Sequence, residues 1–341
     1  MRKLRTVLFL TLIALFAICA RSQVVEPLKL IGAIPMPDLH DGDFDHLTAD
    51  VPDNLLFVAA EENHSVEVID LKSNKVIHSI SGLKAPHSIT YRSDVKKLFV
   101  ADGNDESGEV KIFQGDSYNP VGSVKLRVDA DSSVYDPSTH YMYVVNGGGT
   151  HAGYVFISIV DTTTATKVDD IKVDSDSVEA MALEKSGPRM FANLYAKGVV
   201  AVIDRNKHSV IATWPIEPEG KKNSAIAFDE ADHRLFVVAR DPGKVILLDS
   251  DSGKILNSLP CFGHTDDAVF DPASRRLYVV GETSIDIFQL LGPNRFRQIG
   301  QVPSTFRTIT GTLIPELNRY YVAVPHHGQT PAQILIYEVV P

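Results

Sequence analysis

The chain has 341 residues, of which 44% are hydrophobic and 22% are charged. This is the composition of a globular protein, and it excludes a collagen-like fibre or a chain that is disordered throughout. The formal charge is −10 and no run of Lys and Arg occurs beyond the first residues. Nucleic acid is therefore not an expected partner, because binding to a phosphate backbone depends on clustered cations.

The N-terminus has the pattern of a secretory signal. A basic segment, Met1–Arg5, precedes an apolar run from Val7 to Cys19 that is too short to span a bilayer comfortably. Small residues up to Ser22 predict a signal peptide over residues 1–22 and no transmembrane segment in the mature chain. Acylation of Cys19, giving a lipoprotein, is the alternative. Either route implies a bacterial protein that is periplasmic, secreted or attached to the cell surface.

The cysteine content agrees with stabilisation by a hydrophobic core. Cleavage after Ser22 removes Cys19 and leaves Cys261 as the one cysteine of the mature chain. An exported chain with a single cysteine has no internal disulfide, so its fold has to be held by apolar packing.

One pattern of short strands recurs along the chain after residue 46. Each repeat has an apolar strand, a polar turn, an aromatic–Val strand, a loop and two further strands. The aromatic anchors of the second strands are 42, 44, 48, 45, 42 and 43 residues apart: Phe57, Phe99, Tyr143, Phe191, Phe236, Tyr278 and Tyr321. Four β-branched and aromatic-rich strands per 40–50 residues are typical of a propeller blade. We therefore predict an all-β, seven-bladed β-propeller.

The first strand of the chain indicates how the predicted ring closes. Blade seven supplies only three strands, whereas a spare strand, Leu28–Ile34, precedes the first complete repeat. We expect this strand to become the outer strand of blade seven, because closure removes the free sheet edges. Residues 23–341 then form a single, monomeric propeller domain.

The second and third strands resemble those of a known family. Leu-Phe-Val at 98–100 and Leu-Tyr-Val at 277–279, together with Val-Glu-Val-Ile-Asp at 66–70, are similar to the repeats of bacterial YVTN propellers, which include periplasmic YncE-like proteins. The resemblance covers residues 28–340 and implies an exported propeller. It implies no defined activity, because the architecture hosts lactonases, lyases, quinoproteins and binding modules.

The connecting segments differ between the two faces of the predicted ring. On one face they are short turns led by Asp side chains that we expect to accept backbone hydrogen bonds: Asp70, Asp136, Asp161, Asp204, Asp249 and Asp271. On the other face they are longer, at 146–153, 325–331 and 102–108, as binding loops on a rigid scaffold are. His151 and His326 lie in these loops and are candidate ligand-binding residues.

The innermost strands place polar residues at the mouth of the central channel. Twelve residues before each anchor, and eleven in blade one, stand His46, His87, Asp131, Glu179, Ser224, Asp266 and Ile309; a strict count in blade one gives Asp45. Imidazole and carboxylate are ligands for Zn, Mn, Fe or Cu. The candidate ligands of one divalent metal ion are therefore His46, His87, Asp131, Glu179 and Asp266.

Three further residues near this rim are candidate ligand-binding residues. Arg307 precedes Ile309 by two residues and would compensate the carboxylates or hold an anion. His264 and Asp267 flank Asp266 and replace it if the register shifts by one. The other interpretation of this polar ring is structural, since polar residues at a channel mouth also hydrate the channel and fix loops.

Three functions remain open on this pattern. The first is an exported binding module that recognises a small ligand, a metal ion or a protein partner at the channel mouth. The second is a lactonase- or lyase-like enzyme with a divalent metal, which would lower the pKa of bound water or polarise a substrate oxygen. The third is a scaffold for a periplasmic complex.

Overall fold

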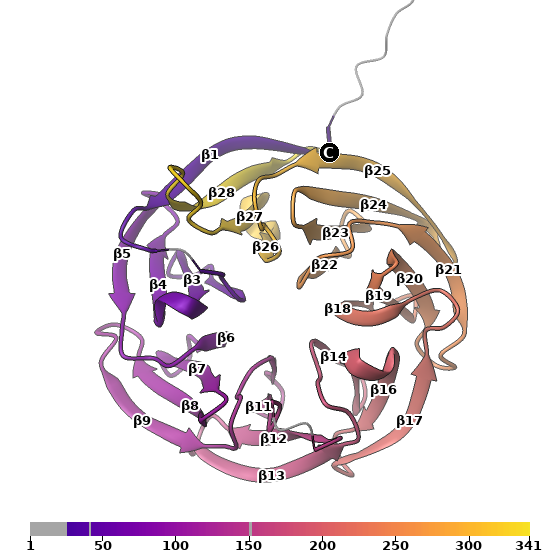
Figure 1. The fold of residues 1–341 in the computed structure, drawn as a ribbon, viewed down its shortest axis with the longest axis horizontal. Helices are drawn as coiled ribbons and strands as arrows, with labels where there is room; N and C mark the ends of the chain where they lie inside the picture. The colour runs from indigo at the N-terminus through magenta and orange to yellow at the C-terminus, as the bar shows by residue number, and fades with distance from the viewer. Residues whose placement is uncertain (1–25, 41, 150–151) are drawn as a thin grey trace, which may run out of the picture.

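The alternation of apolar residues produces seven antiparallel sheets of four strands that surround a central channel (Figure 1). The computed structural model describes residues 26–40, 42–149 and 152–341. The predicted signal peptide over residues 1–22, with Cys19 and Ser22, lies outside the described residues, and so does His151. The predicted all-β propeller of seven blades is confirmed.

Blades one to six each use four consecutive strands, numbered from the channel outward. Their bounds are, in blade one, β2 (Leu47–Asp50), β3 (Leu55–Ala60), β4 (Ser65–Asp70) and β5 (Lys75–Ile80); in blade two, β6 (Pro86–Arg92), β7 (Lys97–Asn104), β8 (Ser107–Gln114) and β9 (Pro120–Lys125); in blade three, β10 (Ser133–Asp136), β11 (Tyr141–Asn146), β12 (Val155–Asp161) and β13 (Thr166–Val173). They continue, in blade four, with β14 (Met181–Leu183), β15 (Arg189–Leu194), β16 (Val199–Asp204) and β17 (Ser209–Pro215); in blade five, β18 (Lys221–Asp229), β19 (Arg234–Asp241), β20 (Gly243–Asp249) and β21 (Ile255–Pro260); in blade six, β22 (Ala268–Asp271), β23 (Arg276–Gly281), β24 (Ser284–Gly292) and β25 (Arg295–Pro303).

Blade seven joins the two ends of the chain. From the channel outward it contains β26 (Gly311–Ile314), β27 (Arg319–Val324), β28 (Ala332–Val339) and β1 (Leu28–Met36). β1 pairs antiparallel with β28, from Leu28 opposite Val339 to Met36 opposite Ala332. The predicted closure by the N-terminal strand is confirmed. β28 is paired on both sides, and the inner edge of β1 is paired with β28.

Burial explains why the second strands are the clearest sequence signal. In β3 and its equivalents nearly every residue is buried, because the strand has a neighbouring blade on each face, whereas an outer strand such as β5 is mostly exposed. The anchors Phe57, Phe99, Phe191, Phe236 and Tyr278 are among the largest fully buried side chains. Burying one such ring contributes about 1.5–3 kcal/mol.

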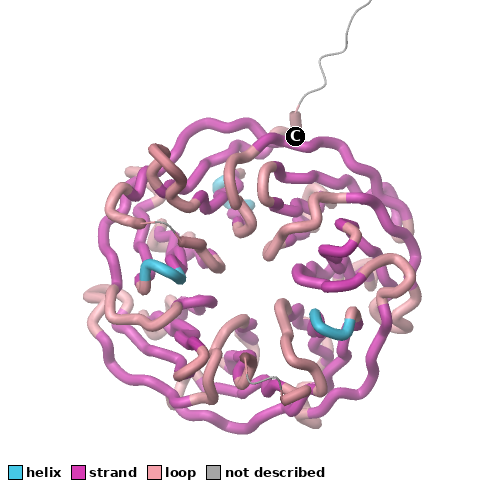
Figure 2. Tube along the Cα trace, viewed as in Figure 1, coloured by secondary structure: helices cyan, strands magenta, loops and turns pink. Residues whose placement is uncertain are grey.

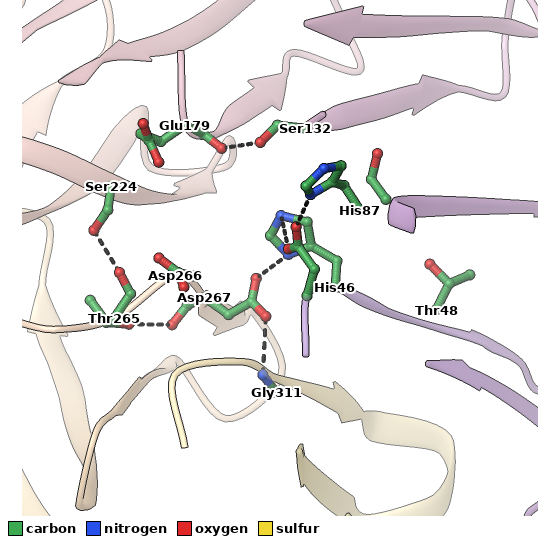
Figure 3. A network of polar contacts seen from close by, with 12 residues as sticks. His46, Thr48, His87, Ser132, Glu179, Ser224, Thr265, Asp266, Asp267 and Gly311 are labelled. Carbon is green, nitrogen blue, oxygen red and sulfur yellow. Dashed lines mark hydrogen bonds and ion pairs between the residues drawn. The ribbon is translucent and has the colours of Figure 1, made fainter. Parts of the chain in front are cut away.

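Hydroxyl groups link neighbouring blades around the channel (Figure 3). Ser88 Oγ of blade two donates to the Asp131 carbonyl of blade three at 2.8 Å, and Ser132 Oγ of blade three donates to the Glu179 carbonyl of blade four. Ser224 Oγ of blade five donates to the Thr265 carbonyl at 2.7 Å. These bonds satisfy polar groups around the channel and fix the backbone of Asp131 and Glu179, whose side chains belong to the site.

The short turns behave as expected, but one predicted loop does not exist. Asp70 Oδ1 accepts the N–H groups of Lys72 and Ser73 at 2.8 and 2.7 Å, as the Asp-led turns were expected to do. The segment 102–108 was expected to be a long loop, which is wrong: β7 runs to Asn104 and β8 starts at Ser107. The Asn104 side chain closes this tight turn by accepting the N–H of Ser107.

Helical structure in the described residues is confined to three short 3-10 turns, drawn in cyan in Figure 2. They are η1 (Glu61–Asn63), η2 (Tyr195–Lys197) and η3 (Pro315–Leu317). None of the helices in the described part of the chain has the length and apolarity that crossing a bilayer requires. η1 joins β3 to β4 on the face of the channel mouth and brings Glu61 to the site.

Candidate functional site

The ring gathers charged side chains from all seven blades around a cavity of about 280 Å³ at the channel mouth. All seven residues aligned from the repeats line it, including both His46 and Asp45 of the ambiguous blade-one register. The lining residues are Asp43, Phe44, Asp45, His46, Glu61, His87, Asp131, Ser132, Glu179, Ser224, Arg240, His264, Asp266, Arg307 and Ile309. The five residues predicted as metal ligands therefore share one cavity, while ligation by them remains a prediction.

Three of the lining residues stand closest together. One ligand atom from each of Asp45, Glu61 and His87 lies within 4.8 Å of the others. Asp45 comes from the segment that leads into β2, Glu61 from η1 and His87 from β6. His87 Nδ1 lies 2.7 Å from Asp45 Oδ2, and its Nε2 lies 3.0 Å from the Gly103 carbonyl oxygen. The backbone bond at Nε2 fixes the ring and turns Nδ1 toward the carboxylates.

A second imidazole extends this network from blade one to blade six (Figure 3). His46 Nδ1 lies 3.0 Å from Asp267 Oδ1, and His46 Nε2 lies 3.4 Å from Asp45 Oδ1. Asp267 Oδ2 accepts the backbone N–H of Gly311 at 3.0 Å. Asp45 thus lies between two imidazoles, and Asp267 connects blade six to blades one and seven.

Most carboxyl groups of the cavity are shifted toward their neutral forms, but the pKa of Asp45 is lowered, because His46 and His87 together outweigh its burial. Burial raises the pKa of Glu61 and of Glu179 to about 7 each. Burial, aided by the nearby Asp45 carboxylate, raises the pKa of Asp131 and of Asp266 to about 6. A cation in the cavity would reverse these shifts, because an opposite charge favours the ionised carboxylate.

The two imidazoles are shifted toward their protonated forms. Burial alone would lower the pKa of His87, but the Asp131 and Asp45 carboxylates outweigh it and raise the pKa to about 10. The pKa of His46 is raised well above its ordinary value, since Asp45 and Asp267 again outweigh burial. Without another cation, both rings are protonated at neutral pH and offset part of the carboxylate charge.

The two arginines of the cavity have carboxylate partners. Arg240, from the end of β19, pairs with Asp266, and Arg307 pairs with Asp43. The expectation that Arg307 compensates the carboxylates predicted as metal ligands is therefore wrong in detail. Its backbone position directs it toward the loop that leads into β2, whereas Arg240 is the cation beside Asp266.

Of the remaining predicted ligand-binding residues, the structure places one in the lining of the cavity and two outside it, and one lies outside the described residues. His264 lines it and lies 3.4 Å from Glu282. Asp267 does not line it but holds His46. His326 is not among the lining residues, because its segment turns back as a hairpin in which His327 and Thr330 pair. His151 lies outside the described residues.

Sequence reasoning missed Asp43, Glu61 and Arg240. All three stand in or beside connections between strands, where lengths vary from blade to blade and the repeat register gives no position. For Glu61 and Arg240 the only signal was a general one: connections between the second and third strands of a blade lie on the channel-mouth face. Glu61 follows β3 and Arg240 lies in the last part of β19, so both obey that rule.

This fold and site define a class: a seven-bladed β-propeller with a charged cavity at its channel mouth. No family model matches the chain, and no curated protein matches it in sequence. Among solved structures it is similar to hydrazine synthase from Kuenenia stuttgartiensis, with a TM-score of 0.74 and 17% identity over 89% of this chain and 99% of that one.

Two other solved structures share the architecture. A chain of the mitotic checkpoint complex gives a TM-score of 0.75 and 15% identity over 99% of both chains. The WD40 repeats of RRP9 give a TM-score of 0.73 and 15% identity over 92% of this chain and 98% of that one. At such identities the likeness establishes the propeller fold alone.

Proposed function

We propose that the protein is a binding module whose channel-mouth cavity holds a divalent metal ion, with Asp45, Glu61 and His87 as its protein ligands. The observation that carries this proposal is the convergence of one imidazole nitrogen and two carboxylates within 4.8 Å of one another. Two carboxylates and one imidazole suit Zn, Mn or Fe, and leave coordination positions for a bound small molecule.

The surroundings of His87 support this role. A metal-binding imidazole commonly donates its other N–H to a carbonyl or carboxylate, which fixes the ring and its tautomer. The bond from His87 Nε2 to the Gly103 carbonyl supplies that support and leaves Nδ1 for the ion. Binding would release the proton from Nδ1, so the affinity for metal is expected to fall as the pH is lowered.

Metal titration of the purified full chain tests the proposal. After treatment with a chelator, Zn²⁺ and Mn²⁺ are titrated by calorimetry into the wild type, His87→Ala and Asp45→Asn, with His264→Ala as a control that lines the same cavity outside the trio. We expect one ion per wild-type chain, a loss of affinity of at least tenfold in the first two variants, and little change in the control. Equal metal binding by His87→Ala and the wild type would refute the assignment.

A metal-dependent hydrolytic enzyme, lactonase- or lyase-like, is the second candidate for the same cavity. It is favoured by His46, which Asp267 orients at 3.0 Å as a carboxylate orients a general base. Arg240 and Arg307 on the cavity wall would position an anionic substrate. Turnover of lactones by the metal-loaded protein, lowered in Asp267→Asn with metal content unchanged, would support the enzyme; metal binding without turnover would favour the binding module.

We also propose that the chain is exported and is a YVTN-like propeller. The basis is the basic and apolar N-terminal pattern together with the Leu-Phe-Val and Val-Glu-Val-Ile-Asp motifs. Expression in a bacterial host with a C-terminal tag should give a periplasmic product that starts at Gln23. A product that starts at Cys19 and carries lipid would identify a lipoprotein, and one that retains Met1 would contradict export.

A further inference from the structure

A second cavity, separate from the channel, lies on the rim of the ring. It is a groove of about 570 Å³ where β1 and β5 lie next to each other (Figure 1). Met36, Leu39, Val76 and Ile77 give it an apolar wall, and Glu67 and His78 are among its polar residues. None of the lining residues is Lys or Arg.

Glu67 is the unusual member of this groove, because it is only 3% exposed and carries a carboxylate. Its Oε1 accepts the hydroxyl groups of Ser65 at 2.6 Å and Ser79 at 2.7 Å. No described residue donates to its other oxygen, Oε2, and that atom is not among the fully buried ones. Hydrogen bonds thus hold the carboxylate through one oxygen, and none of the described residues forms an ion pair with it.

Two other blades also have a charged residue at the position that Glu67 occupies in the third strand of blade one. In both of these blades other residues of the protein bind the charged side chain. Asp286, at this position of β24, accepts the Phe262 N–H with one oxygen and the side chains of Gln298 and Gln301 with the other. Lys111, at this position of β8, donates to the Gly82 carbonyl and pairs with Asp102. Phe262 and Gly82 belong to the segments that lead into blades six and two.

In blade one the described residues of the corresponding segment leave the groove open. Pro37, Asp38, Leu39 and His40 line it, and none of them donates to Glu67. A buried carboxylate without a counterion is costly, and pairing with a cation or strong hydrogen-bond donor removes much of that cost. In blade one, therefore, no described group of this segment binds Glu67, and the open groove lets a molecule from solution reach its carboxylate.

We propose that this rim groove binds a small organic cation, an ammonium or guanidinium group on an apolar body. The cationic group would donate to Glu67 Oε2, and the apolar body would lie against the wall formed by Met36, Val76 and Ile77. The volume is in the range of small-molecule sites, which combine apolar walls with a few placed polar groups. The site is independent of any metal at the channel mouth.

The test compares amines with neutral molecules of similar shape. Binding of 2-phenylethylamine, n-hexylamine and agmatine to the full chain is measured by calorimetry, with 2-phenylethanol and n-hexanol as neutral counterparts. We expect at least one amine to bind at least tenfold more tightly than its neutral counterpart, and Glu67→Gln to abolish that difference. Asp286→Asn is the matched control at the equivalent position and should leave the difference unchanged, as should His87→Ala at the channel mouth.

A second variant fills the groove without altering the bonds of Glu67. Ile77 is 52% exposed, so Ile77→Trp is compatible with the fold and should weaken amine binding at least fivefold. Failure of all three amines to bind, or amine binding that survives Glu67→Gln, would overturn the proposal. So would binding of a lysine-containing peptide at this groove when none of the small amines binds, because the partner would then be a protein.

Discussion

Replacing Glu61 by Gln should stabilise the metal-free protein at high pH while weakening its metal site. Burial, with further contributions from Asp45, Glu62 and Asp43, raises the pKa of Glu61 from 4.5 to about 7. A carboxyl whose pKa is higher in the folded than in the unfolded state costs no stability below pH 4.5. That cost grows as the pH rises from 4.5 to 7 and is complete above 7.

The magnitude follows from the two pKa values. At about 1.36 kcal/mol per pH unit, the full cost of ionising Glu61 in the folded chain is about 3 kcal/mol at pH 8 and below about 1 kcal/mol at pH 5. Gln is never ionised, so Glu61→Gln should be more stable than the wild type by about these amounts. The variant should also lose the metal-induced stabilisation of the wild type, because one of three ligands is gone.

Urea unfolding in a chelator at pH 5 and pH 8 measures the effect, with Glu62→Gln as the control. Glu62 is the exposed neighbour of Glu61 in the same 3-10 turn, so its replacement should change stability by less than about 0.5 kcal/mol. A Glu61→Gln protein that is as stable as the wild type at pH 8, or less stable, would show that Glu61 is not held in an unfavourable ionised state.

Three further changes test two links between blades and the packing of one aromatic anchor. Ser132→Ala removes the donor to the Glu179 carbonyl and should lower the free energy of unfolding by about 1 kcal/mol in urea denaturation. An unchanged midpoint would show that this link contributes nothing. Phe99→Ala empties a fully buried position and should cost about 3–5 kcal/mol, measured in the same way; a cost below about 1 kcal/mol would contradict the packing described. Asp267→Asn should destabilise the protein by about 1–3 kcal/mol at pH 6, and the difference should shrink as the pH rises through the raised pKa of His46, because their ion pair needs a protonated ring.

The fold could be predicted from the sequence because one strand in each blade carries its own signal. The second strands are covered on both faces, so their apolar runs and aromatic anchors repeat at a nearly constant interval. The strand that closes the ring was predictable for a different reason, since blade seven lacked one strand and the chain had one to spare. The repeated second strands therefore predicted seven blades, and the number of strands predicted that the N-terminal strand completes the seventh.

The site was predictable only where it follows the repeat. His87 lies at the start of β6, and Asp131 and Glu179 lie two residues before β10 and β14. Counting back from the anchors therefore placed all three at the channel mouth, and all three line the cavity. Glu61 could not be placed in this way, because the connection that carries it differs in length and shape in each blade. The register also could not choose between Asp45 and His46, and the structure brings both to the cavity.

The pairing of β1 with β28 also bears on how this molecule comes into being. β1 precedes the other strands of the ring in the chain and finds its partner only when Ala332–Val339 have been synthesised, so every nascent chain passes through a stage with an unfinished seventh sheet. Loop closure over about 300 residues is slow and opposed by chain entropy, and a polypeptide truncated before residue 332 would present an unpaired edge to other chains. Completion of the ring therefore depends on the pairing of β1 with β28.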